Sequence, residues 1–503
     1  MASYASDTTE LAGGSASPRY HGISGEVLHI AMVYLITGFV TFLAMGLLGL
    51  TMRLHHAGWL TLSPDWFYRI MTIHGAGMVA ALLLAAMGGM IAVLNQTVRL
   101  SARWLLVAFQ IYFMSLAFVL IAVLAGGFAG AWTALDPLPF HGLTWSVWAG
   151  VVMFVGFFCI AIGFLIYSLH LFFALRAKFG GVGNALGWPV LFGRKKSGAE
   201  GTPRPPELAA MVVAIVGILT GLSGIAVLVP LFADAAGVIA PINALYAKNF
   251  QMFFGHALAN LSIYLGVGLV YATLPLLTNR PWASSRLVIL AWNLVIILVI
   301  IPWSHHLYMD LAQPTPIQIL GQVASYAIAP PLILVTILGV MTIVFRSGLR
   351  WTAPAILFVL GIWGWVFGGM GAVLDSTIAI NNVTHNTMWV PAHFHTYYLL
   401  GVASFIWGYL FYLISDLGRL KADRFSAWAA WLYGVGAVGF VMMFYLAGAH
   451  SIPRRFDIRL PEWHIYAEIA VPFVVLLGLS ILWLTIVMAR GLKRAWRQTA
   501  AES

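Results

Sequence analysis

Long apolar segments recur along this chain of 503 residues, and they constrain its fold more than any other feature. A helix needs about 20 predominantly apolar residues to cross a bilayer. Twelve segments reach that length and several exceed it, so tilted helices or extensions beyond the membrane are expected. We predict an all-α polytopic membrane protein, a bundle of twelve transmembrane helices. The predicted helices span 25–50, 66–95, 103–130, 144–176, 207–234, 249–278, 284–306, 316–345, 352–378, 390–416, 427–449 and 464–490.

The composition supports a membrane protein and excludes several other classes. Hydrophobic residues make up 61% of the chain and charged residues 8%, against about 25% charged residues in soluble proteins. The net charge of +10 does not indicate a nucleic-acid partner, because the basic residues lie in loops between apolar segments. The single cysteine, Cys159, excludes a disulfide framework, a covalent haem attachment motif and a multi-cysteine metal centre.

The basic residues predict an orientation. If both termini are cytoplasmic, most of the 26 Lys and Arg residues fall in the inner segments, as expected for membrane proteins. Three of the remaining ones, Arg454, Arg455 and Arg459, cluster in one outer loop, which requires a separate explanation. We predict a polar cytoplasmic tail at 1–24, one helical domain at 25–490 and a second cytoplasmic tail at 491–503. The basic, Gly- and Pro-rich loop at about 177–206 is the candidate linker.

The acidic residues weigh against the simplest alternative, a secondary transporter. All 16 lie in tails, in loops or near predicted helix ends. Cation-driven transporters commonly keep a carboxylate inside the membrane for coupling. A transporter or sensor without catalytic turnover stays open as an alternative.

Six histidines occupy the place where such carboxylates would be expected. Each falls in the outer half of a predicted helix or near it. A single histidine in a helix is more often a hydrogen-bonded structural residue than a ligand. Six imidazoles at one depth, however, are costly to bury unless something binds them. Metal ligation is the simplest compensation, and neutral imidazole suits copper, iron and zinc. The six are His74, His256, His305, His306, His393 and His395.

The spacing of His393 and His395 limits what they can bind. Residues two apart on an α-helix point about 200° apart, so these two cannot share one metal. They can each ligate a different large planar cofactor, one on either side of the helix. The predicted helix at 390–416 would then stand between two haems.

The motifs "HGAGM", "FFGH", "PWSHH", "HNTMWVPAHFH" and "PRR" together resemble subunit I of the haem-copper oxidase superfamily. The resemblance covers nearly the whole chain, with the motifs in the family order. The motif "HNTMWVPAHFH" is most similar to the corresponding motif of the B-type oxidases.

The resemblance implies a role for each motif residue. It implies two haems, one low-spin and one high-spin, and one further metal. His74 and His395 would be the axial ligands of the low-spin haem, and His393 the single ligand of the high-spin haem. The remaining assignments are a copper ion on His256, His305 and His306, and haem propionates or haem edges beside Arg454, Arg455, His385 and Trp389.

Asn260 departs from the B-type pattern. B-type oxidases read His-Pro-Ile-Val-Tyr in this helix, and the tyrosine supplies an electron and a proton for O–O cleavage. This chain reads "HALAN", so Asn260 occupies the tyrosine position. Tyr271, Leu274 and Pro275 keep the family register further along the helix. The segment at 284–306 also carries no tyrosine ahead of its histidines. On the next helix, Gly321 and Ala324 stand where B-type oxidases have a serine and a threonine.

The missing phenol favours NO over O₂ as the substrate. Asparagine has no accessible redox chemistry, although its amide can donate and accept hydrogen bonds. Reduction of two NO to N₂O and water needs only two electrons and two protons. We therefore expect NO reduction, with Asn260 bonding an N–O group beside His256, His305, His306 and His393. Reduction of O₂ to water by a proton-translocating cytochrome c oxidase is the alternative.

Further expectations concern the metal, the electron donor and the location. No glutamate accompanies the three metal histidines, which favours copper over non-haem iron. Electrons would come from a partner, a subunit II with a two-copper or c-type cytochrome domain, and from cytochrome c. The expected location is a prokaryotic inner membrane.

Overall fold

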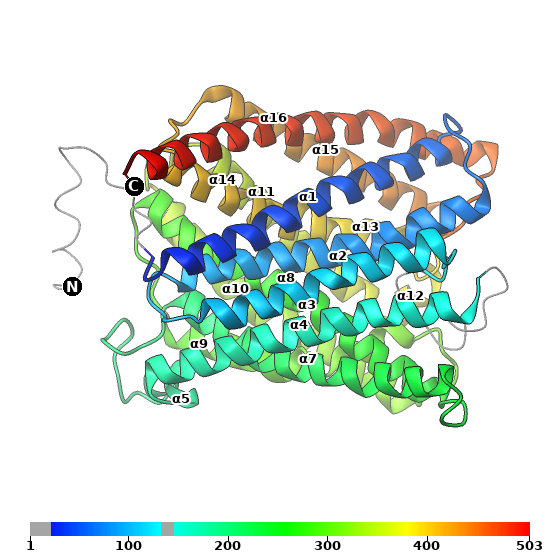
Figure 1. Cartoon of the computed structure of the whole chain (residues 1–503), viewed down its shortest axis with the longest axis horizontal. Helices are drawn as coiled ribbons and strands as arrows, with labels where there is room; N and C mark the ends of the chain where they lie inside the picture. Colours follow the sequence, from blue (N-terminus) through cyan, green and yellow to red (C-terminus); the bar gives the residue numbers. More distant parts are fainter. Residues whose placement is uncertain (1–21, 132–144, 503) are drawn as a thin grey trace.

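The protein is a bundle of long helices packed side by side (Figure 1). The computed structural model describes residues 22–131 and 145–502. The described residues form helices and no strands, apart from a single bridge between Thr387 and Pro453. Most of the predicted amino-terminal tail lies outside the described residues. The last helix continues through most of the predicted carboxy-terminal tail.

Eleven helices of the described residues are long and apolar enough to cross a membrane. They correspond to eleven of the twelve predicted segments, so the predicted membrane bundle is confirmed. The elements that build them are α1 (Gly25–His56), α2 (Pro64–Leu94), α3 (Ala102–Leu120) with η1 (Ile121–Ala125), α4 (Val147–Phe179), α7 (Pro205–Ala235), α8 (Ala244–Thr278), α10 (Thr315–Val344), α11 (Ala353–Asp375), α13 (Trp389–His395) with η3 (Thr396–Ala403) and α14 (Ser404–Leu417), α15 (Arg424–Ala449), and η4 (Pro461–Trp463) with α16 (His464–Glu502).

The segment predicted at 284–306 is not one continuous helix. It forms α9 (Arg286–Leu298) and then the 3-10 helix η2 (Pro302–Leu307). Pro302 explains the break, because it has no N–H to bond the carbonyl of Leu298 and its ring clashes with that carbonyl. The break matters for the site, since η2 carries His305 and His306.

The central helix changes its winding directly after the two histidines that are two residues apart. α13 ends at His395, and η3 continues as a π-helix before α14 resumes. π-Turns leave backbone groups without their usual helical partners. The carbonyl of Leu399 in η3 accepts a hydrogen bond of 2.5 Å from the hydroxyl of the buried Tyr433.

The loop at 177–206 is packed against the bundle and is not a free linker. It contains α5 (Val182–Ala185) and α6 (Trp188–Leu191). The indole N–H of Trp188 donates to the Oδ1 of Asn293 at 2.9 Å. The buried carboxylate of Glu207, at the start of α7, closes the loop. It accepts from Lys178 at 2.6 Å, from Thr97 at 2.7 Å and from the backbone N–H of Arg204 at 2.8 Å.

We predict that Glu207→Ala destabilises the protein. The substitution removes a buried acceptor and leaves the two cations beside it without their counter-charge. Breaking a buried ion pair costs about 3–5 kcal/mol, and partial exposure of Lys178 and Arg204 places this case near the lower figure. Thermal unfolding in detergent measures the effect. Glu200→Ala, an exposed acid in the same loop, is the control and should leave the midpoint unchanged.

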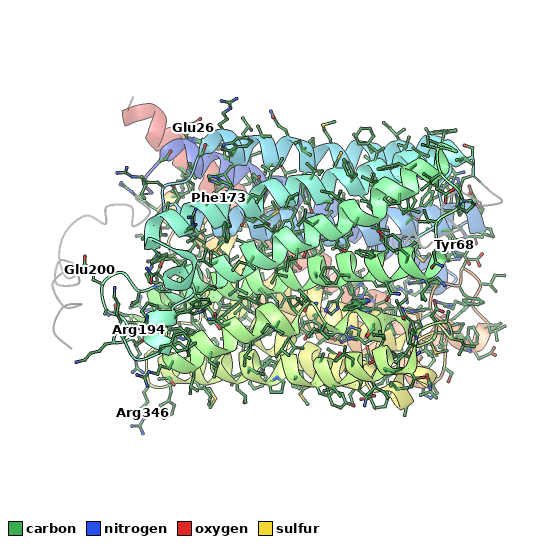
Figure 2. All side chains as sticks on the ribbon, turned by 90° about the horizontal axis from the view of Figure 1, so that it is seen from below. Glu26, Tyr68, Phe173, Arg194, Glu200 and Arg346 are labelled. Carbon is green, nitrogen blue, oxygen red and sulfur yellow. The ribbon has the colours of Figure 1, made fainter. Side chains whose placement is uncertain are left out.

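Segments that hold most of the Lys and Arg residues meet at one end of the bundle. Figure 2 shows Glu26, Arg194, Glu200 and Arg346 at one end and Tyr68 at the other. We call the first the basic end and the second the far end. The prediction that the basic end is cytoplasmic stays a prediction.

Candidate metal and cofactor site

A cavity of about 980 Å³ lies inside the bundle, and all six histidines singled out in the sequence line it. They come from α2, α8, η2 and α13, which are far apart in the chain. The cavity also reaches Arg53, Arg454, Arg455 and Arg459 at the far end. One cavity therefore joins the candidate ligands to a group of cations.

Three histidines form a compact cluster in this cavity. The ligand atoms of His256, His305 and His306 all lie within 4.8 Å of one another. The Nε2 of His306 is 3.1 Å from the Nδ1 of His256 and 3.0 Å from the Nε2 of His305. Metal–imidazole bonds are about 2.0–2.1 Å long, so one ion could contact all three nitrogens after small shifts. This donor set fits a single metal ion.

Hydrogen bonds set the orientation of His305. Its Nδ1 lies 2.8 Å from the hydroxyl oxygen of Ser325, and that hydroxyl donates to the carbonyl of Gly321 at 2.6 Å. The serine oxygen must therefore accept from the Nδ1–H of His305. The Nε2 of His305 then carries the lone pair, and it is the nitrogen that faces the cluster.

Asn260 lies directly beside this cluster. Its Nδ2 is 3.3 Å from the Nε2 of His256 and donates to the backbone carbonyl of His256 at 2.9 Å. Asn260 also lines the cavity. Its amide thus contacts the Nε2 side of the His256 ring, whereas the Nδ1 of that ring faces His306.

His74 and His395 form a second, separate pair. Their rings are nearly parallel, with an interplanar angle of 15° and centroids 6.4 Å apart. His74 donates through Nδ1 to the carbonyl of Met45, and His395 through Nδ1 to that of Pro391, each at 2.7 Å. A carbonyl can only accept, so each Nδ1 carries the proton and each Nε2 is available as a ligand. The pair is suited to hold one metal atom from two sides.

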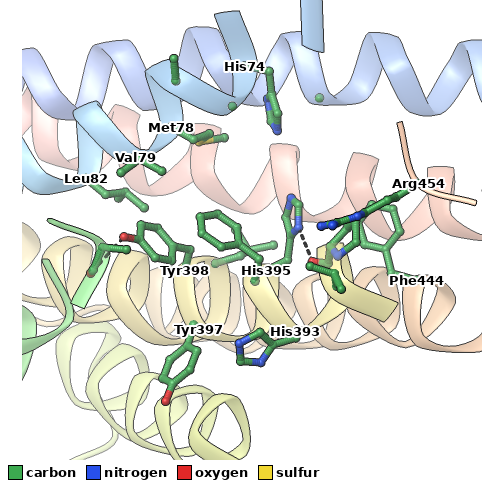
Figure 3. A pocket seen from close by; sticks show the side chains of 18 of the residues that line it. His74, Met78, Val79, Leu82, His393, His395, Tyr397, Tyr398, Phe444 and Arg454 are labelled. Carbon is green, nitrogen blue, oxygen red and sulfur yellow. Dashed lines mark hydrogen bonds between the residues drawn. The ribbon is translucent and has the colours of Figure 1, made fainter. Parts of the chain in front are cut away.

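Figure 3 shows His393 on the opposite side of α13 from His74 and His395, in line with the spacing argument. The Nδ1 of His393 is buried and has no hydrogen-bond partner. Its ring centroid lies 5.2 Å from that of Tyr397. The central helix thus presents one imidazole to each of two compartments of the cavity.

Two glycines allow the close approach of neighbouring helices to these imidazoles. A Cβ atom on Gly49 of α1 would lie 2.9 Å from the Cε1 of His74. A Cβ atom on Gly371 of α11 would lie 2.7 Å from the Nδ1 of His393. Any side chain at either position would displace a candidate ligand.

The cations at the far end form a larger group than the sequence indicated. The sequence placed Arg454, Arg455 and Arg459 together in one outer loop, and Arg53 of α1 joins them in lining the cavity. Among the residues that the structure describes, none of the four makes an ion pair with a carboxylate. The Nη1 of Arg459 is buried without a hydrogen-bond partner. Arg455 is exposed and the other three arginines are partly buried. Guanidinium groups without a carboxylate partner fit an anionic ligand, and carboxylates suit them best.

The structure places the two remaining predicted residues, His385 and Trp389, in different surroundings. His385 lines the cavity, and a guanidinium nitrogen of Arg454 lies 3.4 Å from its Nε2. Burial, together with the charge of Arg454, lowers the pKa of His385 to about 4, so this imidazole is neutral at physiological pH. Trp389 is not among the residues that line the cavity. Its ring packs against Tyr445 at a centroid distance of 4.8 Å.

The donor sets fit the metal groups that the sequence motifs imply. The parallel rings of His74 and His395, the unpartnered Nδ1 of His393 and the compact triad of His256, His305 and His306 supply imidazoles only. Imidazole is a preferred ligand of iron and copper. The unpaired arginines fit the carboxylates that a haem carries.

Comparisons with known proteins agree with this geometry. The sequence profile of the family described as "Cytochrome C and Quinol oxidase polypeptide I" matches residues 29–489. The chain is 25% identical to "Cytochrome c oxidase subunit 1" of Thermus thermophilus over 279 residues, which cover 51% of this chain and 49% of that protein. It is 20% identical to "Probable quinol oxidase subunit 1" of Staphylococcus haemolyticus over 258 residues, 51% of this chain and 39% of that one. The chain thus spans about half the length of these relatives or less.

The fold also matches a solved structure. A cryo-EM structure of a heme-copper terminal oxidase dimer superposes with a TM-score of 0.77 and 18% sequence identity. The match covers 94% of this chain and 84% of that one. At this identity the likeness concerns the arrangement of the helices.

Proposed function

Because the chain belongs to the cytochrome c and quinol oxidase polypeptide I family, we propose that it is the catalytic subunit of a membrane-bound haem-copper reductase that converts NO to N₂O. Its overall reaction would be two NO, two electrons and two protons giving N₂O and water. The donor sets described above support two haems and one copper ion as its cofactors.

We assign the low-spin haem to His74 and His395 and the high-spin haem to His393. Helix α13 would then lie between the two haems and separate them by the width of one helix. We assign the copper ion to His256, His305 and His306. When bound, these groups supply the electron transfer and the substrate-binding metal atoms. The chain itself orients the imidazoles through Met45, Pro391 and Ser325.

The four arginines at the far end would hold the haem propionates. Arg454 and Arg455 were proposed from sequence, and the cavity lining adds Arg53 and Arg459. Two haems carry four propionates, so four unpaired guanidinium groups match their number. Arginine can bind a carboxylate through two parallel hydrogen bonds, which would fix the haem position as well as its charge.

The observation that carries NO as the substrate is the contact between Asn260 and His256. The amide lies at 3.3 Å from the Nε2 of His256, where the B-type oxidases place their tyrosine. An amide can donate and accept hydrogen bonds but cannot supply an electron. A two-electron reaction does not need that electron, whereas four-electron reduction of O₂ does.

Copper is favoured over iron as the third metal. The triad consists of imidazoles, and no carboxylate of the described residues joins the metal-ligand group. Iron in such sites is commonly assisted by a carboxylate ligand.

Asn260→Tyr tests the substrate assignment. The added phenol should raise O₂ reduction relative to the parent and lower NO turnover, while local overpacking costs about 1–3 kcal/mol. Both rates are measured on one preparation whose haem and copper contents have been checked. The control is Ile263→Tyr, which adds a phenol elsewhere in the cavity lining and should not increase O₂ reduction. A parent that reduces O₂ at rates typical of oxidases would remove the reason for assigning NO.

Reduction of O₂ is the second candidate function, and two observations favour it. The curated relatives include cytochrome c oxidase subunits by name. In addition, Tyr264 and Tyr397 line the same cavity, so their phenols could replace the missing one. A tyrosyl radical that disappears in Tyr264→Phe or Tyr397→Phe would support this alternative.

The electron donor would be a separate polypeptide. The chain has one cysteine, Cys159, and thus no cysteine set for a two-copper centre. We propose a subunit II with a two-copper or c-type cytochrome domain, reduced by cytochrome c, at the far end. The proposed location is a prokaryotic inner membrane, with the basic end in the cytoplasm.

A further inference from the structure

We propose that Asp375 is the acid that delivers protons to the metal site from the far end of the bundle. The proposal rests on the proposed function, because any reduction of NO or O₂ in the cavity consumes protons there. It adds the residue and the side of the membrane from which those protons come.

Asp375 is the last residue of α11 and lines the cavity. Among the described residues that line this cavity, it is the one carboxylic acid. The other lining groups that can exchange protons are the histidines assigned to metals, His56, His385 and several phenols. Chemistry that consumes protons inside the cavity needs a group that carries protons to it. A carboxylic acid can lose and regain a proton, so Asp375 is the best candidate among the lining residues.

The carboxyl group of Asp375 is held by few partners. It takes part in none of the four ion pairs of the described residues. Its Oδ1 is buried without a hydrogen-bond partner. The Nδ2 of the neighbouring Asn381 donates a hydrogen bond of 2.7 Å to the backbone carbonyl of Asp375 and not to its carboxyl group. The indole N–H of Trp389 lies near the carboxyl group but its Nε1, like the Oδ1 of Asp375, is buried without a hydrogen-bond partner, so the Oδ1 can bind a proton and release it.

The groups around the carboxyl come from three other elements. Arg454 from the far-end loop and Trp389 from α13 interact with it, and Tyr445 of α15 lies within range of its charge. His385 joins this surround through its contact with Arg454. A cation close by stabilises the carboxylate that remains after a proton has left.

Asp375 lies within a few residues of exposed positions at the far end. α12 (Ile378–Thr384) follows it directly, and Asn382 and Val383 on that helix are exposed. The connecting turn is fixed by Tyr308, which donates to the carbonyl of Ser376 at 3.1 Å, and by Tyr326, whose hydroxyl lies 2.6 Å from that of Thr377. Asn381 is buried, and its Oδ1, which has no partner, also borders the cavity. These polar atoms can bind water between the surface and the carboxyl group.

The proton balance is simple. The O–H bond of the Asp375 carboxyl breaks, and the proton passes through cavity water to the oxygen that leaves as product water. The carboxylate then takes a proton from water at the far-end surface. Two such cycles accompany two electrons from the donor subunit for each N₂O formed.

Three variants test the proposal in the complete complex reconstituted in vesicles. Asp375→Asn should lower NO turnover, and proton uptake from the far-end side, by about 100-fold, in line with the usual contribution of an acid–base group. Asp375→Glu should restore both to within about tenfold of the parent. Glu462→Gln, which removes an exposed acid at the same end, should change neither. Haem and copper contents must match the parent in every variant.

A second measurement does not depend on turnover. Infrared difference spectra between the oxidised and reduced protein should show a carboxyl C=O band that shifts in D₂O and is absent from Asp375→Asn. A band that persists in this variant, or unchanged proton uptake in it, overturns the proposal. If the parent reduces O₂ and not NO, the proposed substrate fails, and the same measurements made with O₂ still decide the role of Asp375.

Discussion

Replacing His305 with alanine is expected to remove the non-haem metal and abolish turnover while both haems stay bound. The triad provides three imidazole nitrogens within 4.8 Å of one another, and two imidazoles alone do not retain the ion in competition with water and chelators. The haem ligands lie on other elements, so the haem sites should survive. Metal analysis of the purified protein, together with its haem absorption spectrum, measures both effects. The parent should contain one copper per two haems.

Ser325→Ala is the matched control for this experiment. It keeps all three ligands and removes only the hydroxyl that accepts from the Nδ1 of His305 at 2.8 Å. Loss of such an orienting group typically weakens metal binding by about 10–100-fold, so copper should be retained at saturating concentration. Stoichiometric non-haem iron without copper in the parent would show that the metal has been misassigned.

The second large effect concerns the parallel imidazole pair. His74→Ala and His395→Ala should each abolish the low-spin haem spectrum and stop electron delivery, because each removes one of the two nitrogens that face one another across the cavity. The high-spin haem should still bind CO, since His393 lies on the opposite side of α13. Absorption and electron paramagnetic resonance spectra distinguish the two haems. His450→Ala, at an exposed position, should leave both spectra unchanged. Loss of CO binding in either variant would mean that the two haem assignments are exchanged.

Much of this architecture could be predicted because apolar length and histidine spacing are properties of single helices. Eleven segments formed membrane-length helices with ends near those expected. The opposite directions of His393 and His395 follow from the geometry of a helical turn. The segment at 284–306 was predicted as one continuous helix, which is wrong. A proline in an apolar helix can either kink it or end it, and which of the two happens depends on how the neighbouring helices pack around it. In this fold the break is what presents His305 and His306.

The residues that the sequence did not reveal act through contacts between distant segments. Arg53 lies at the end of α1, and only the packing of the far-end loop brings it into the same cavity as Arg459. Ser325 follows two positions that differ from the B-type pattern, Gly321 and Ala324, and nothing local indicates that its hydroxyl meets His305. The packing of the loop at 177–206 likewise depends on the buried Glu207, which in the sequence is only one of many helix-end acids.

The most direct test of the central claim is the product formed from isotopically labelled NO. The purified complex, reduced with excess electron donor and free of O₂, is given ¹⁵N-labelled NO, and the N₂O released is counted against the donor oxidised. The account predicts labelled N₂O with two electrons consumed for each molecule, at a rate that exceeds O₂ reduction by the same preparation. Absence of labelled N₂O, together with clean four-electron reduction of O₂ to water, would contradict it and identify Asn260 as a tolerated substitution in a terminal oxidase.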